Sequence, residues 1–337
     1  MGSNVLLVGF LVADIVVPEL NRIAEPGELI FVPKGIYLSI GGHPANIAID
    51  LVKMGFNPKD IMLISAVGKD IFGDFIVNTL NEYGLDLMIE RVEVPTNKNV
   101  ILVVKGQDRR FHVEVGASLY IPVVKVLKIL ESCKPTILYI SSGILGKIDD
   151  ELERILRRAR QLDVLTFIDV VKPYDKTWDF LIDALPYVNI LHCNDRELID
   201  ITNEKELNRA IEKVVKSGVE LLFVTLGEKG AMAINKSGIL IQPAFKIEVV
   251  DPTGAGDAFC SGVILKLLEK YEDSIKILDI SNIPIEEISE IMLFAQALGA
   301  QACRGPGTTT AINKEEVYNL LEKQGSEILK KQKVRGL

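Results

Sequence analysis

The sequence predicts an α/β protein built on a doubly wound, mainly parallel sheet, with helices on both faces and a small β-sheet lid beside it. Two observations support this fold class. Short strands rich in β-branched residues alternate with helical segments over most of the 337 residues. Near-continuous apolar strands of this kind belong in a parallel sheet that helices cover on both sides. Two stretches interrupt the alternation and have the pattern of a separate small sheet.

The regular part of the chain consists of strands separated by helices. The strands are expected at 5–8, 61–66, 137–141, 166–169, 190–193 and 221–225. The helices are expected at 44–54, 70–83, 122–132, 149–161, 177–185 and 204–216. Gly55, Gly84 and Gly218 lie just past three of these helices, where a left-handed residue commonly ends a helix. A further strand is expected at 245–250, before an apolar helix at 255–269.

Two stretches without good helices predict the small sheet. Residues 11–38 are punctuated by prolines and glycines, and residues 92–115 have the pattern of a hairpin that turns at 106–108. Paired with each other, they can cover an active site as a lid or pair with a second subunit. The expected organisation is a core of residues 1–10, 39–91 and 116–330, a lid of residues 11–38 and 92–115, and a basic, frayed C-terminal tail at 331–337.

Composition narrows the class of protein. A hydrophobic content of 48% is enough for a large core, and a net charge of −8 argues against nucleic acid as the main partner. The four cysteines stand far apart, which is typical of reduced thiols in a cytoplasmic protein. The apolar run 5–17 contains Asp14, is too short to span a bilayer and lacks the flanks of a signal peptide. We interpret this run as a buried first strand and expect no membrane association.

The most informative segment is Asp251-Pro252-Thr253-Gly254-Ala255-Gly256-Asp257, at the start of the helix expected at 255–269. Gly254, Ala255 and Gly256 are small enough for a phosphate to approach the free amide groups and the positive dipole end of that helix. Asp257 is best explained as a base that takes the proton of a hydroxyl attacking phosphorus. The segment therefore indicates phosphoryl transfer to an alcohol. The alternative is a glycine-rich turn with Asp257 as a favourable first-turn acid.

A second segment with paired glycines opens the helix expected at 44–54. Gly41 and Gly42 allow a substrate to touch the backbone, and Asn46 offers both a donor and an acceptor to a hydroxyl. Asp14, just after the first strand, can accept two hydroxyl protons. The alternative is a simple helix cap. His43 is interpreted as a packing or capping residue without a chemical role.

Two further motifs follow expected strands at their carboxyl ends, where open α/β sheets bind ligands. Asn194 and Glu197 lie on one face of an opening helical turn and can organise Mg²⁺-bound water near phosphates. A capped helix start with a capping box fits the same spacing equally well. Thr225, Gly227 and Gly230 can line the phosphates and ribose of a nucleotide, or form a tight turn.

Taken in order, these motifs resemble the ribokinase/PfkB family of carbohydrate kinases over nearly the whole chain. The resemblance rests on Gly41-Gly42…Asn46, Asn194-x-x-Glu197, Thr225-Leu226-Gly227-x-x-Gly230 and Asp251-x-Thr253-Gly254-Ala255-Gly256-Asp257. It implies a ribokinase-like fold with the small sheet as its lid. It also implies transfer of the γ-phosphate of ATP to a sugar-like hydroxyl.

The resemblance assigns a role to each motif. Asp257 matches the family's base, and residues 254–256 match its anion hole. Asn194 and Glu197 match the motif that positions Mg²⁺ and phosphates, and Thr225, Gly227 and Gly230 match the nucleotide side. The sugar side is matched by Asp14, Gly41, Gly42 and Asn46. Asp251 and Thr253 match part of the site at which many members use a monovalent cation, which here would be K⁺.

The acceptor is less well defined. Where ribokinases proper usually have Lys-Gly, this chain has His43-Pro44, which puts ribose in doubt and is more similar to fructokinases, ketodeoxygluconate kinases and archaeal inositol or nucleoside kinases. Arg109 and Arg110, on the expected hairpin, can reach an acidic or phosphorylated sugar or form a solvated tip. We expect a kinase of a sugar or polyol. The alternatives are a nucleoside kinase and a non-catalytic sugar-binding regulator, which the intact Asp257 disfavours. A homodimer through the lid is expected by analogy with dimeric relatives.

Overall fold

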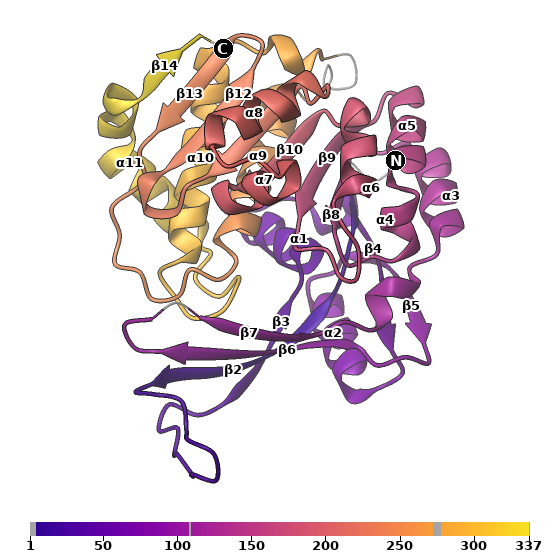
Figure 1. The fold of residues 1–337 in the computed structure, drawn as a ribbon, viewed down its shortest axis with the longest axis vertical. Coiled ribbons are helices and arrows are strands. Elements are labelled where there is room, and N and C mark those ends of the chain that lie inside the picture. Colours follow the sequence, from indigo (N-terminus) through magenta and orange to yellow (C-terminus); the bar gives the residue numbers. More distant parts are fainter. Residues whose placement is uncertain (1–4, 108, 272–277, 337) are drawn as a thin grey trace.

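The chain folds around two sheets of different size (Figure 1). The computed structural model describes residues 5–107, 109–271 and 278–336. The larger sheet has ten strands in the order β14-β13-β12-β11-β10-β9-β8-β1-β4-β5. These strands are β1 (Val5–Val8), β4 (Ile61–Gly68), β5 (Asp86–Val92), β8 (Ile137–Ser142), β9 (Leu165–Val170), β10 (Ile190–Asn194), β11 (Leu221–Thr225), β12 (Ala231–Asn235), β13 (Gly238–Gln242) and β14 (Lys333–Arg335).

Most of the larger sheet is parallel. All neighbouring strands from β11 to β5 run in the same direction, whereas β12, β13 and β14 add an antiparallel edge. Every residue of β1, β8 and β9 is buried. Strands buried along their whole length need cover on both faces, and the chain provides it with the helices between the strands. The predicted doubly wound α/β fold class is therefore confirmed.

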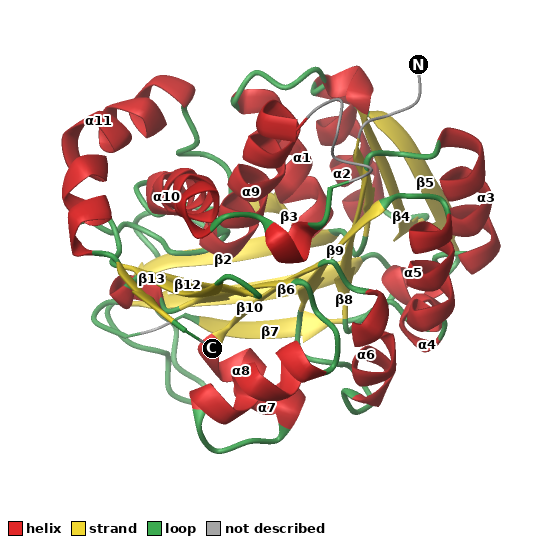
Figure 2. Cartoon of the chain, turned by 90° about the horizontal axis from the view of Figure 1, so that it is seen from above, coloured by secondary structure: helices red, strands yellow, loops and turns green. Residues whose placement is uncertain are grey.

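Helices cover both faces of the larger sheet (Figure 2). One face carries α1 (His43–Lys53), α2 (Ile71–Glu82), α9 (Ala255–Tyr271), α10 (Ile285–Ala302) and α11 (Lys314–Lys331). The other carries α3 (Val123–Cys133), α4 (Lys147–Asp150), α5 (Leu152–Gln161), α6 (Asp179–Ala184), α7 (Asp195–Thr202) and α8 (Leu207–Lys216). Strand residues alternate between the two cores, with Leu7 in the first and Leu6 in the second. Within the described residues, none of the helices is both long and apolar enough to cross a membrane.

The smaller sheet projects from the body of the protein and combines the two stretches that interrupt the α/β alternation (Figure 1). Its strands, in the order β3-β2-β6-β7, are β3 (Tyr37–Gly41), β2 (Val12–Leu20), β6 (Asn97–Val104) and β7 (Arg110–Glu114). The central strands β2 and β6 are parallel, and each outer strand is antiparallel to its neighbour. The predicted pairing of the two stretches is confirmed. The exact division into core and lid stays a prediction, since β3 extends to Gly41.

Three local predictions are wrong. The run 5–17 is not one strand, because β1 ends at Val8 and the chain then enters β2 of the other sheet. Residues 245–250 form no strand and lead to α9 as a loop. The tail is not simply frayed, because β14 pairs with β13 as an antiparallel edge strand. In each case the local sequence is compatible with a strand and with a loop. Whether a strand forms depends on whether a neighbouring strand is present to pair with it.

Helix α1 carries a fully buried acidic side chain, Asp50. Neither of its carboxylate oxygens has a hydrogen-bond partner among the described residues. Burial raises the pKa of Asp50 well above its ordinary value of 3.8; the nearby charge of Asp257 acts in the same direction, and Lys53 opposes it. Since the folded state disfavours the ionised form, the contribution of Asp50 to stability is greatest below the unfolded pKa and is lost as the pH rises.

The substitution Asp50→Asn tests how much stability the buried carboxyl group costs at high pH. Asparagine keeps the shape of the protonated side chain and cannot ionise. We expect the melting temperature to rise relative to the native protein at about pH 8, by roughly 2–4 °C for each kcal/mol recovered, and the gain to disappear near pH 4. Calorimetry across this pH range measures the difference. Asp183→Asn, at an exposed position of α6, is the matched control. A gain that is the same at both pH values would contradict the interpretation.

Candidate active site

The carboxyl ends of the parallel strands and the amino ends of α1 and α9 meet around Asp257. Asp257 lies in the first turn of α9 and is buried. Its Oδ2 accepts a hydrogen bond of 2.7 Å from Nδ2 of Asn46, in the first turn of α1. Burial raises the pKa of Asp257, while the charge of His43 and the hydrogen bond from Asn46 lower it. The structure therefore brings the predicted base together with a predicted sugar-side residue.

The predicted anion site is a genuine helix start. The amide of Ala258 donates to the carbonyl oxygen of Gly254 as the first helical hydrogen bond, so the amides before it have no acceptor within the helix. Gly254 has a φ of 81°, and a Cβ there would lie 2.5 Å from the carbonyl oxygen of Thr308. Only glycine fits this turn without strain. Within this segment the amide of Ala255 donates to the carbonyl oxygen of Pro252, whereas the amides of Gly254 and Gly256 have no acceptor among the described residues and lie near the start of the helix that carries Asp257.

The predicted sugar-side residues line one wall of the site. Asp14, on β2, is buried, and burial raises its pKa to about 7 although Asn99 lowers it by donating a hydrogen bond of 3.0 Å. Gly41 packs directly against this carboxylate, since a Cβ there would lie 2.1 Å from Asp14 Oδ2. Gly42 is the N-cap residue of α1 and lines the same cavity as Asp14. Sequence analysis missed Asn99, which the parallel register of β2 and β6 places opposite Asp14.

Asn194 and Glu197 form the capping box of α7. The side-chain oxygen of Asn194 accepts from the amide of Glu197, and Glu197 Oε2 accepts from the amide of Asn194, each at 2.8 Å. The capping alternative from the sequence is therefore correct for both residues. They also line the site, and burial raises the pKa of Glu197. Capping and a role in the site are compatible here, because the start of α7 faces the cavity.

Two cavities meet at the start of α9. The first, of about 710 Å³, is lined by the sugar-side residues Asp14, Gly42 and Asn46 and by Asp257. The second, of about 570 Å³, is lined by predicted ligand residues, namely Thr225, Gly227, Gly230, Ala255 and Gly256. Its apolar wall includes Phe245, Ile247 and Ala300. Both cavities include Asn194, Thr225, Pro252 and Gly256. A molecule bound in the first cavity and a molecule bound in the second can therefore meet at the start of α9.

A buried polar cluster around Asp169 lies next to Asp257, and it was not predicted from the sequence to be functional. Asp169, near the end of β9, accepts hydrogen bonds from the hydroxyl of Tyr139 at 2.8 Å and pairs with Nδ1 of His192 at 3.0 Å. Nδ1 of His43 lies 3.2 Å from Asp169 Oδ2 and 3.6 Å from Asp257 Oδ1. The available signal was the position of Asp169 near the carboxyl end of a predicted strand.

The cluster has a clear charge pattern. Burial raises the pKa of Asp169, but the neighbouring charges of His192 and His43 outweigh this and hold it well below the ordinary value. Burial lowers the pKa of His43, but Asp257 and Asp169 outweigh this and raise it to about 9. Asp169 is therefore ionised and His43 is charged at neutral pH.

Asp169, His192 and Cys260 are close enough to one another to bind a metal ion. The hydrogen bonds and ion pairs of Asp169 already explain its burial without one.

The two residues expected to bind a monovalent cation contact an arginine of the small sheet. The hydroxyl and amide of Thr253 both donate to Asp251 Oδ1, and the amide of Gly307 donates to Asp251 Oδ2. Nη1 of Arg109 donates to Thr253 Oγ1 at 2.5 Å and lies 3.6 Å from Asp251 Oδ1. The hairpin that carries Arg109 is therefore packed over the site, with this arginine directed inward and not at a solvated tip.

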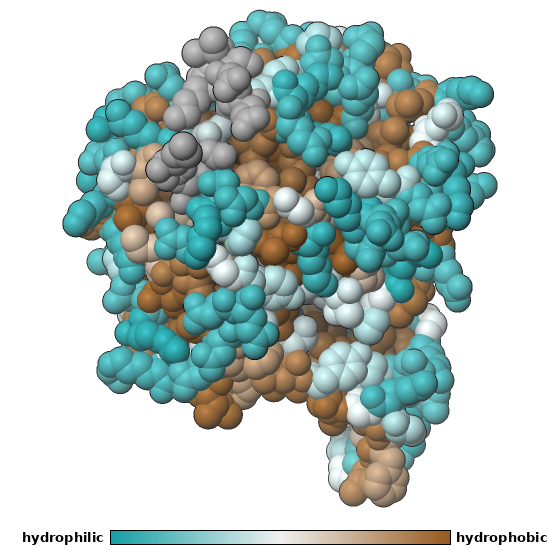
Figure 3. Space-filling model, turned by 180° about the vertical axis from the view of Figure 1, so that it is seen from behind, coloured by the Kyte–Doolittle hydropathy of each residue, from teal (hydrophilic) through white to brown (hydrophobic). Residues whose placement is uncertain are grey.

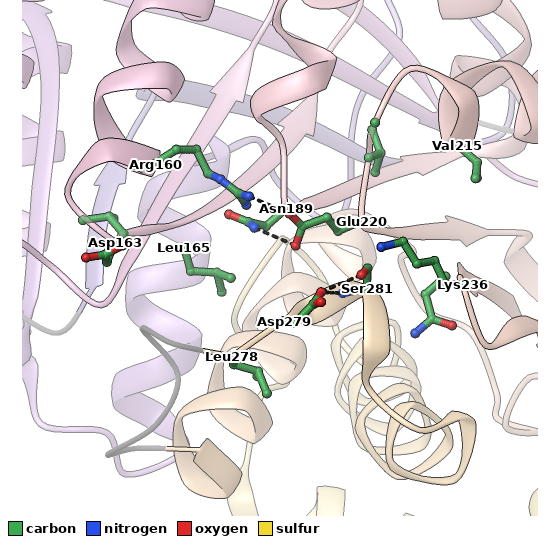
Figure 4. Close-up of a pocket in the computed structure, with 14 residues that line it drawn as sticks. Arg160, Asp163, Leu165, Asn189, Val215, Glu220, Lys236, Leu278, Asp279 and Ser281 are labelled. Atoms are coloured by element: carbon green, nitrogen blue, oxygen red, sulfur yellow. Dashed lines mark hydrogen bonds and ion pairs between the residues drawn. The ribbon is translucent and has the colours of Figure 1, made fainter.

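A further cavity, of about 740 Å³, lies at the opposite end of the strands (Figure 4). Leu165, Asn189 and Glu220 line it at the amino ends of β9, β10 and β11. Two of its polar side chains pair with Glu220: Arg160 forms an ion pair with it at 2.7 Å, and Asn189 donates to the same carboxylate. Ligands of open α/β sheets bind at the carboxyl ends of the strands, which favours the two cavities around Asp257 as the active site.

The comparisons with known proteins agree with this geometry. The sequence profile of the pfkB family carbohydrate kinase matches residues 3–315. An ATP-dependent 6-phosphofructokinase from Thermoanaerobacterium thermosaccharolyticum is 28% identical over 249 residues, which are 68% of this chain and 73% of that protein. A ribokinase from Lactococcus lactis is 26% identical over 279 residues, 82% of this chain and 88% of the relative.

Solved structures share the fold. The structure of a ribokinase from Giardia lamblia superposes with a TM-score of 0.80 at 21% identity, covering 96% of this chain and 99% of that one. The order of motifs, the two sheets, the paired cavities and the match over almost the full length thus lead to one conclusion. The chain belongs to the pfkB family of carbohydrate kinases, which are ATP-dependent phosphotransferases.

Proposed function

We propose that the protein transfers the γ-phosphoryl group of ATP to a hydroxyl of a sugar or sugar-like polyol, with Asp257 as general base and Gly254–Gly256 as anion hole. The observation that carries the proposal is the junction of two cavities at the start of α9. Asp257 faces the cavity that holds the predicted sugar-side residues. Gly256 belongs to both cavities, so its amide lies between the two bound substrates.

The acceptor occupies the first cavity. Asp14 and Asn99 form a hydrogen-bonded pair that can accept from and donate to neighbouring hydroxyls, and Asn46 holds Asp257 by one oxygen. The hydroxyl that reacts gives its proton to Asp257 as its oxygen attacks the γ-phosphorus. The bond from that phosphorus to the bridging oxygen of ATP then breaks, and ADP leaves. The amides at the start of α9 stabilise the negative charge that develops on the transferred group.

ATP occupies the second cavity. Its glycines at 227 and 230 give close access to backbone, and its apolar wall, which includes Phe245, suits a nucleotide base. Mg²⁺ is suited to the carboxylate and amide oxygens at the start of α7, where Glu197 and Asn194 would hold it through water. When bound, it neutralises charge on the phosphates.

One observation favours a nucleoside as an alternative acceptor. The first cavity is lined by apolar side chains of the small sheet, namely Ile101, Phe111 and Val113, and by Phe10 from the core. Such a surface can pack against a nucleobase. Arg109 and Lys172 line the same cavity and would instead favour a phosphorylated or acidic sugar.

A coupled ADP-release assay on fructose, ribose, 2-keto-3-deoxygluconate, myo-inositol, fructose 6-phosphate, adenosine and cytidine separates these classes of acceptor. Silence across the panel with retained sugar binding would favour the non-catalytic regulator.

The substitution Asp257→Asn tests the assigned base. We expect turnover on the best acceptor to fall by roughly 10²- to 10⁴-fold, as is typical of losing general-base help, because the amide cannot take up the hydroxyl proton. Binding of ATP and of the acceptor, followed by titration calorimetry, should change little, since the hydrogen bond from Asn46 can still form. Asp183→Asn serves as the control. Near-native turnover of the Asp257 variant would refute the mechanism.

For the cation site we propose that Arg109 supplies the positive charge next to Asp251 and Thr253. The native enzyme should then have nearly the same rate in K⁺ and in tetramethylammonium buffers. Arg109→Gln removes the charge and opens these oxygens, so its activity should depend on K⁺. Rates measured across a K⁺ titration decide the matter, with Arg110→Gln as the neighbouring control. Strong K⁺ activation of the native enzyme would show that the cation, and not Arg109, fills this position.

We further propose that the chain forms a homodimer through the small sheet. The projection that contains this sheet is partly apolar in Figure 3. The large exposed apolar side chains of the sheet and its connecting loop that lie outside the acceptor cavity are Ile23, Leu29, Phe31, Ile36 and Leu38. The double substitution Leu29→Glu and Phe31→Glu should convert a dimer into a monomer by light scattering. Val124→Glu, at an exposed apolar position of α3, should not. A monomeric native protein would exclude this assembly.

A further inference from the structure

His43 lies between two carboxylates at the point where the base must work. Its ring nitrogen Nδ1 is 3.2 Å from Asp169 Oδ2 and 3.6 Å from Asp257 Oδ1. The ring packs against Phe10 with a centroid distance of 5.0 Å. The side chain is 21% exposed and borders the acceptor cavity. This position joins the base to the buried cluster around Asp169.

Asp169 is held firmly enough to orient His43. The hydroxyl of Tyr139 donates to its Oδ2, the amide of Val170 donates to its Oδ1, and His192 pairs with Oδ1. His192 is in turn stacked on Phe259 with an interplanar angle of 23°. The carboxylate that faces His43 therefore has a fixed position and a stable negative charge.

The charges around Asp257 come from several elements. The carboxylates are Asp14 on β2, Asp50 on α1, Asp169 on β9 and Glu197 on α7. The histidines are His43 at the start of α1 and His192 on β10, while Tyr139 on β8 and Cys260 on α9 are the remaining titratable neighbours. Arg109 and Lys172 line the same cavity. Negative charge and burial both oppose ionisation of Asp257, and among the described residues His43 is the basic side chain in direct ion-pair range of it.

We infer that His43 is a positioning residue whose charged imidazole, in ion-pair range of Asp169, keeps the carboxylate of Asp257 ionised and oriented toward the acceptor hydroxyl. The inference rests on the proposed function, because it concerns the base of that reaction. It differs from the packing or capping role that the sequence suggested for His43. A packing role predicts an effect on folding, whereas a charge role predicts an effect on the pH at which the base loses its proton.

The pH dependence of kcat/KM in the variant His43→Asn tests the charge. Asparagine keeps a hydrogen-bond donor near the position of Nδ1 but has no charge. With the imidazolium removed, the pKa of Asp257 rises, so the acid limb of the profile should move to higher pH by roughly 1–3 units. His43→Lys restores a positive charge and should move the limb back toward its native position. His112→Asn, at an exposed position of β7, should leave it unchanged. An acid limb at the native pH in His43→Asn would overturn the inference.

A second measurement does not need turnover, so it separates this inference from the proposed function. Nitrogen-15 NMR of the histidine rings follows the titration of His43 in the native protein and in Asp257→Asn. Because the coupling is reciprocal, His43 should lose its proton at lower pH when the neighbouring carboxylate is removed. The same His43 titration in both proteins would refute the coupling even if the protein is a kinase. A coupled His43 without kinase activity would refute only the proposed function.

Discussion

The proposed reaction requires Asp257 to remain ionised while it is buried at the start of a helix, and the arrangement of the site fits this constraint. A buried carboxylate needs hydrogen bonds and positive charge to offset its lost hydration. The amino ends of α1 and α9 meet at this point, where Asn46 donates to one carboxylate oxygen and His43 lies near the other. The dipole of α9 acts in the same direction. Packing these two helices together therefore forms the surroundings of the proposed base as well as part of the core.

The small sheet completes the site and depends on its own register. Pairing of β2 with β6 places Asn99 opposite Asp14, and the hydrogen bond between them forms one wall of the acceptor cavity. A slip of β6 by one residue would turn Asn99 to the other face of the sheet, away from Asp14. The hairpin of β6 and β7 also carries Arg109 to Asp251 and Thr253 beside the anion hole. The sheet thus contacts both the proposed acceptor side and the proposed phosphate side of the site.

Sequence reasoning identified the residues whose type is unusual for their place in the chain. Glycines before helices and an acid directly after such glycines interrupt the regular apolar pattern, so Gly254 and Asp257 were visible. Asp169 and His192 were not, because each lies within a strand that reads as buried apolar sequence. The two possibilities left open for Asn194 and Glu197 are both compatible with the structure, which uses them as a capping box at the edge of the cavity.

The sequence by itself determined the α/β alternation, the helix starts and the ordered motifs, because these depend on residues close together in the chain. Only the tertiary structure decided which polar groups meet. Asn46 and Asp257 are 211 positions apart, and no local pattern specifies their 2.7 Å contact. The tail strand β14 likewise exists because the edge of β13 is available to it. The charge balance around Asp257 also depends on distances across several elements, and those distances exist only once the sheets and helices have packed.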